Sequence, residues 1–265
     1  MVWKAVDPFK TVEPEGCRVT VAGQSYDLDL EQSENAAIIT AESIRRNLPA
    51  HAATIALATA MQESKLRNID YGDRDSLGLF QQRPSQGWGT PTQLMDPWYS
   101  SGKFYEELVK FGNWQEISVN DAAQQVQRSG YPEAYRQHEP LAEAWASALT
   151  GQSPSALSCV NRSSAATTID KLTQTTRKAM ANKVAIQTNG STVTFTAADP
   201  VSTRAAVALT MASTNVGPID RATVATTSWS ADPEHYTSWK AASGPSASPA
   251  ASETGRVTGT VTARS

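Results

Sequence analysis

Glu63 is the residue of this chain whose neighbours best suit acid–base chemistry. It lies near the end of an expected helix, and helical spacing puts Ala56, Thr59 and Ala60 on the same face. Because these three side chains are small, a ligand can approach the carboxylate closely. The negative end of the helix dipole and partial burial both favour the protonated carboxyl, so we expect a raised pKa. Such a group suits a general acid that works near neutral pH.

Other carboxylates and other roles fit the same stretch. Glu63 has the ordinary alternative of an exposed side chain that pairs with Lys65 or Arg67. Bond cleavage by an activated water can need a second carboxylate, and the loop after the helix offers three candidates: Asp70, Asp73 and Asp75. Turn formation and helix capping account for aspartates in such a loop equally well.

Short motifs surround Glu63 in a consistent order. Residues 62–64 (Gln-Glu-Ser), Asn68 and residues 76–81 (Ser-Leu-Gly-Leu-Phe-Gln) are similar to the Glu-Ser and Gly-Leu-Met/Phe-Gln signatures of the superfamily of lysozyme-like lytic transglycosylases. Residues 122–129, with Pro132 and the Ala-Tyr pair at 134–135, are similar to the matching part of actinobacterial members. The resemblance covers roughly residues 30–150.

The resemblance implies cleavage of the β-1,4 bond between N-acetylmuramic acid and N-acetylglucosamine in peptidoglycan. Glu63 would protonate the glycosidic oxygen and then act as base while the muramic acid 6-hydroxyl attacks its own C1, giving a 1,6-anhydro sugar. Substrate-binding roles carry over to Ser64, Ser76, Gly78, Leu79, Phe80, Gln81 and Tyr135. Gly78 would let the substrate approach the backbone, and Ser64 has the alternative of bonding its own helix. The loop between Glu63 and Gly78 departs from the family pattern in length and charge.

Two other functions fit these motifs. The fold could serve as a module that binds peptidoglycan or assembles at the cell envelope, with little or no catalysis. It could also hydrolyse the glycan with water, as goose-type lysozymes do. An aspartate facing Glu63 across a groove would distinguish hydrolysis from the single-glutamate reaction.

Composition and charge exclude several classes of protein. The chain has 265 residues, 40% of them hydrophobic, and a net charge of −3, so neither nucleic acid nor an anionic membrane is an expected partner. No apolar run approaches ~18 residues, so no membrane-spanning segment is expected. The three histidines, His51, His138 and His235, are scattered, and we expect neither a metal site nor a cofactor. Protein partners remain unassigned.

Cys17 and Cys159 are the only cysteines, and they flank the motif-bearing region. Such a pair suits a disulfide in an exported protein, although two unrelated buried thiols are the alternative. No signal peptide is visible at the start of the sequence. The chain is then either intracellular or a segment whose export signal has been removed. We expect an extracellular or cell-surface protein.

The elements indicate an α+β protein in two parts. Residues 1–30 are expected to form an extended arm with a short hairpin near Ala22-Gly23, and residues 31–151 a helical domain, which the resemblance implies is lysozyme-like. Its helices are expected at 31–47, from just after Pro49 to Glu63, and at 101–111, 119–129 and 139–149, with a loop over 83–97 rich in glycine and proline. Residues 152–165 are a Ser- and Ala-rich linker.

The second part, residues 166–265, is expected to be a separate small α/β domain with no catalytic group. Its predicted order is a helix at 167–182, a hairpin at Asn189-Gly190, a helix that opens at Asp199-Pro200, β-structure over 222–229 and a last strand over 256–262. Residues 241–254 are of low complexity.

Three aromatic residues follow the catalytic motif: Trp88, Trp98 and Tyr99. They can stack on sugar rings, or they can pin the surrounding loops to the core. For any single tryptophan, the second interpretation is favoured.

Overall fold

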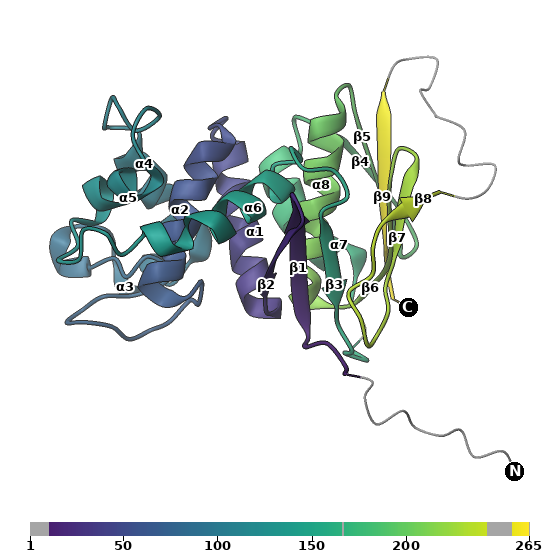
Figure 1. Ribbon diagram of the computed structural model, residues 1–265, viewed down its shortest axis with the longest axis horizontal. Helices are drawn as coiled ribbons and strands as arrows, with labels where there is room; N and C mark the ends of the chain where they lie inside the picture. The colour runs from purple at the N-terminus through teal and green to yellow at the C-terminus, as the bar shows by residue number, and fades with distance from the viewer. Residues whose placement is uncertain (1–10, 166, 243–255, 265) are drawn as a thin grey trace, which may run out of the picture.

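The computed structural model describes residues 11–165, 167–242 and 256–264, and its architecture is α+β, as the sequence predicts (Figure 1). The described helices are α1 (Leu30–Arg45), α2 (Ala50–Ser64), α3 (Pro91–Leu94), α4 (Pro97–Leu108), α5 (Val119–Gln127), α6 (Glu139–Leu149), α7 (Ile169–Met180) and α8 (Pro200–Ala212). The described strands are β1 (Gly16–Val21), β2 (Gln24–Leu28), β3 (Leu157–Val160), β4 (Ala185–Asn189), β5 (Thr192–Ala197), β6 (Ile219–Val224), β7 (Thr227–Ser230), β8 (Lys240–Ala241) and β9 (Val257–Ala263).

Helix α2 is the buried centre of the helical part. Residues 52–60 are all buried, and the helix packs against α1, α5 and α6. A helix that is apolar on every side belongs in a core, and the alanine-rich sequence lets its neighbours approach closely. Pro49 precedes the first turn, and Lys65 ends the helix in the left-handed conformation (φ 55°). Glu63 therefore stands in the last turn of a firmly packed helix.

Strands β1, β2 and β3 form an antiparallel sheet in the order β2-β1-β3. The hairpin expected at Ala22-Gly23 joins β1 to β2, as predicted. Cys17 and Cys159 are direct partners across β1 and β3, and they form the expected disulfide. The prediction of a linker over 152–165 was wrong, because it contains β3, whose four residues are all buried. Its short apolar run is hidden among serines and alanines.

The second sheet has six antiparallel strands in the order β4-β5-β9-β6-β7-β8. The Asn189-Gly190 hairpin is confirmed as the β4–β5 turn, and the predicted last strand, β9, lies between β5 and β6. Helices α7 and α8 contact this sheet and also pack against α1. They therefore lie between α1 and the six-stranded sheet (Figure 1). One continuous hydrophobic core runs from Cys17 to Ala263. Most of the low-complexity stretch predicted at 241–254 lies outside the described residues.

Two prolines expected to break structure instead begin helices. Pro91 and Pro97 each take the first helical position, after Thr90 and Asp96, whose side chains accept backbone hydrogen bonds as N-caps. Proline suits this position because its fixed φ matches the helix and its missing N–H has no partner there anyway. The predicted loop over 83–97 was therefore wrong in part, and α4 begins four residues before the expected 101.

Candidate active site

Glu63 lies on the wall of a groove with a volume of about 600 Å3. The groove is formed by the end of α2, the segment from 81 to 88, residues of α4 and the end of α5. Its charged lining residues are Glu63, Arg83, Lys103, Glu107 and Arg128. The expected access of a ligand to Glu63 agrees with this geometry.

The Glu63 carboxylate is partly buried and accepts a hydrogen bond from the segment that follows α5. The Tyr135 hydroxyl donates a 2.7 Å hydrogen bond to Glu63 Oε1. Burial raises the pKa of Glu63 above its ordinary value, and hydrogen bonds from Tyr135 and Gln127 offset part of that rise. Burial also raises the pKa of Tyr135, so this residue stays a hydroxyl donor. Glu63 is thus poised to release a proton and to be stabilised as a carboxylate afterwards.

The alternative role for Glu63, a surface pair with Lys65 or Arg67, does not occur. Arg67 instead makes ion pairs with Asp29 and Glu31 at the start of α1. Lys65 is exposed at the left-handed end of α2. The hydrogen-bond partner that the structure gives Glu63 is therefore Tyr135, not a surface cation.

A tight turn over residues 77–82 packs against the end of α2. Leu77 and Gln82 exchange backbone hydrogen bonds of 3.0 and 3.1 Å, and the Ser64 hydroxyl donates to the Leu79 carbonyl at 2.8 Å. On the other side, Gln127 Nε2 donates to the Phe80 carbonyl at 2.8 Å. These bonds fix the turn between α2 and α5, and Gln81 within the turn belongs to the groove lining.

Two of the seven predicted substrate-binding residues either line the groove or contact Glu63. Gln81 lines the groove, and Tyr135 contacts Glu63. The other five are buried and lie outside the groove lining: Ser64, Ser76, Gly78, Leu79 and Phe80. They support the turn from within.

Ser64 and Gly78 show what such support consists of. The Ser64 hydroxyl bonds its own helix at Ala60, as its local alternative predicts, and it also holds Leu79. Gly78 has φ +74°, and a Cβ there would stand 2.4 Å from the Leu94 carbonyl oxygen. Packing within the protein therefore accounts for this glycine.

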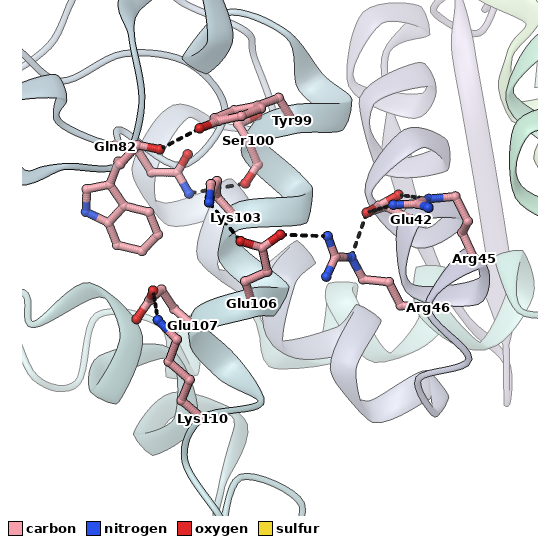
Figure 2. A network of polar contacts seen from close by, with 11 residues as sticks. Glu42, Arg45, Arg46, Gln82, Tyr99, Ser100, Lys103, Glu106, Glu107 and Lys110 are labelled. Atoms are coloured by element: carbon pink, nitrogen blue, oxygen red, sulfur yellow. Dashed lines mark hydrogen bonds and ion pairs between the residues drawn. The ribbon is translucent and has the colours of Figure 1, made fainter.

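The three loop aspartates lie outside the groove lining, whereas a glutamate that the sequence did not single out belongs to it. Asp75 pairs with Arg83 and accepts hydrogen bonds from Ser85. These contacts, above all the one with Arg83, lower the pKa of Asp75. Asp70 and Asp73 are exposed. The second groove carboxylate is Glu107 on α4, which forms an ion pair with Lys110 (Figure 2).

The aromatic residues divide between the two expected roles. Trp88 lines the groove, where its ring can meet a sugar. Trp98 is covered by the Lys178 ammonium, 4.1 Å from the ring centre, which ties α4 to α7. The Tyr99 hydroxyl donates to the Trp88 carbonyl at 3.3 Å and so pins the Trp88 loop.

Sequence reasoning missed the amide character of the groove. Five glutamines belong to its lining: Gln81, Gln82, Gln86, Gln125 and Gln127. Gln82 is almost fully buried, and its Nε2 donates to the Ser100 carbonyl at 3.2 Å (Figure 2). The available signal was the concentration of glutamine in two short runs, 81–86 and 124–127. Primary amides offer both donors and acceptors, which suits the hydroxyl and acetamido groups of a glycan.

A chain of ion pairs anchors the α4 wall of the groove to α1 (Figure 2). Lys103, which lines the groove, binds Glu106 at 2.8 Å, and Glu106 binds Arg46 at 3.2 Å. Arg46 and Arg45 both bind Glu42, whose side chain is buried, at 2.6 Å. The buried Glu42 carboxylate needs these two arginine partners, and the Arg46–Glu106 pair connects the end of α1 to α4.

Replacement of Tyr135 by phenylalanine tests the hydrogen bond from its hydroxyl to Glu63. The loss of a donor destabilises the carboxylate, so the Glu63 pKa rises further and the protonated acid persists to higher pH. For a reaction in which Glu63 is the general acid, we expect the alkaline limb of the pH–rate profile to move to higher pH, and turnover to fall about tenfold. Tyr131→Phe is the matched control and should leave the limb in place. An unchanged limb in Tyr135→Phe would contradict this role.

Within the described residues, no cluster of three or more His, Cys, Asp or Glu side chains is arranged to hold a metal ion. In the same part of the chain, no helix combines the length and apolar character needed to cross a bilayer. Comparison of the chain with protein-family models and with curated proteins yields no match. The geometry around Glu63 therefore carries the functional argument.

Proposed function

We propose that this protein cleaves peptidoglycan glycan strands as a lytic transglycosylase, with Glu63 as the single acid and base. The observation that carries the proposal is a half-buried carboxyl with a raised pKa inside a groove lined by five glutamine side chains. The motifs that resemble the lysozyme-like superfamily surround the same residue. The family assignment is part of the proposal.

In the first step, the Glu63 carboxyl gives its proton to the oxygen that links muramic acid C1 to the next sugar, and the C1–O bond breaks. The Glu63 carboxylate then takes the proton of the 6-hydroxyl as O6 bonds to C1. The acid is regenerated, and the product is a 1,6-anhydro sugar. Tyr135 stabilises the carboxylate between the two steps, because its hydroxyl donates to Glu63, and nearby Gln127 also favours the charged form.

The disulfide supports a site of action outside the cytoplasm. Disulfides persist in oxidising compartments and are rare where thiols are kept reduced. The Cys17–Cys159 bond closes a long segment that includes the whole groove. We therefore place the protein at the cell surface or outside the cell, where peptidoglycan lies.

Mass analysis of the fragments released from purified cell wall tests the reaction directly. The proposal expects anhydro ends, which are lighter than reducing ends by one water. Reducing ends alone would overturn it in favour of hydrolysis. Binding to cell wall without release of either product would favour the binding module.

Hydrolysis has its own structural candidate, because Glu107 is a second carboxylate in the groove. A water attack needs a second group to activate the water or stabilise the sugar cation, whereas the internal 6-hydroxyl does not. We expect Glu107→Gln to reduce cleavage by less than about tenfold and to leave the anhydro product unchanged. A loss as large as that of Glu63→Gln would support the hydrolytic alternative.

A further inference from the structure

The turn between β4 and β5 contains the only Asn-Gly pair in the sequence. Asn189 is the last residue of β4 and pairs with Thr192 across the hairpin, so Gly190 and Ser191 form the turn. Asn189 and Gly190 are both exposed, and a Cβ built on Gly190 would meet no atom within 4 Å. Solvent therefore reaches the Asn189 side chain and the peptide bond that follows it.

Two neighbouring groups of this turn, the Asn189 side chain and the Gly190 N–H, are free of hydrogen bonds within the described residues. Gly190 has φ +56°, which glycine adopts without steric cost. It also carries no side chain that would shield its nitrogen. The Gly190 nitrogen can therefore approach the side-chain carbonyl carbon of Asn189, the geometry from which a succinimide ring closes.

The position of β4 in its sheet gives the turn room to distort. β4 is an edge strand with β5 as its neighbour, and four of its five side chains are exposed. β5 lies between β4 and β9 and buries Val193 and Phe195. Because an edge strand can detach locally without opening the core, the end of β4 can adopt the backbone conformation that ring closure requires.

We propose that Asn189 is a site of spontaneous deamidation, and that its conversion loosens β4. A base in the solvent removes the Gly190 N–H proton, and the nitrogen bonds to Asn189 Cγ while the side-chain nitrogen leaves as ammonia. One water then opens the succinimide at either carbonyl and leaves aspartate or isoaspartate. Each product makes the formal charge of −3 more negative by one. Isoaspartate also adds a methylene to the main chain, which displaces the pair between residue 189 and Thr192.

Peptide mapping of the full folded chain, sampled during incubation at mildly alkaline pH, tests the modification. Asn113 and Asn182 are internal comparators, because both are exposed but are followed by Trp114 and Lys183. We expect residue 189 to exchange its amide for a carboxyl group about tenfold faster than either comparator, because no side chain follows it to hinder ring closure. Isoaspartate should be among the products, whereas direct hydrolysis of the side chain gives aspartate alone.

Hydrogen exchange before and after the incubation tests the structural consequence, with Asn189→Ser as the matched control that cannot deamidate at this position. We expect the amides of residues 185–189 in the converted wild-type chain to exchange about tenfold faster, while residues 192–197 and the incubated control keep their rates. Conversion at residue 189 no faster than at Asn113 and Asn182, or aspartate as the sole product, would overturn the proposed reaction. Unchanged exchange in β4 after conversion would overturn its loosening.

Discussion

Replacing Glu63 by glutamine is expected to lower glycan cleavage by about 10²–10⁴-fold, the range typical of one positioned acid–base group. Glutamine keeps the length and shape of the side chain but has no proton to give to a leaving oxygen. The Tyr135 hydroxyl can still donate to the amide oxygen, so the groove should keep its form. The measurement is the rate of fragment release from purified peptidoglycan, with cell-wall binding assayed in parallel.

Wall binding should be largely retained in Glu63→Gln, which separates loss of chemistry from loss of structure. Asn replacements at Asp70, Asp73 and Asp75 are the charge controls and should cost far less, because none of these residues lines the groove. Asp75→Asn removes an ion pair with Arg83 and can shift that loop, so its unfolding midpoint should be measured as well. Full activity in Glu63→Gln would refute the proposed mechanism.

Removal of the Cys17–Cys159 disulfide is expected to give the largest loss of stability. The bond joins residues 142 apart in the chain, and loop-closure entropy for such a length corresponds to ~5 kcal/mol in the free energy of unfolding. Both cysteines are buried, so the paired variant Cys17→Ala with Cys159→Ala avoids leaving buried hydroxyl groups. Urea unfolding followed by circular dichroism gives the difference.

A reducing agent provides the control. It should destabilise the wild-type protein to nearly the level of the double alanine variant and leave that variant unaffected. A loss below ~1 kcal/mol would show that the unfolded chain gains little freedom when the bond is removed. The bridged residues already face each other across β1 and β3, so the native strands should retain their pairing in the variant.

The sequence by itself determined the local elements that contain their own signals. Alanine-rich helical spacing and Pro49 located α2, with Glu63 near its end. Asn189-Gly190 located a hairpin, because few residue pairs satisfy the positive φ angles of such a turn. The two cysteines foretold the disulfide, since the chain offers no other partner. Each of these features depends on residues close in sequence or on a unique pair.

Tertiary structure alone decided which side chains share the groove. Glu63, Glu107 and Gln127 come from three helices. The sequence of each helix does not show which other helices it will pack beside. The same reason explains why β3 went unrecognised and why β9 lies within its sheet, because strand pairing joins residues far apart in the chain. Predicted site residues such as Leu79 and Phe80 are buried behind the groove, because the turn that contains them must satisfy its packing before it can present Gln81.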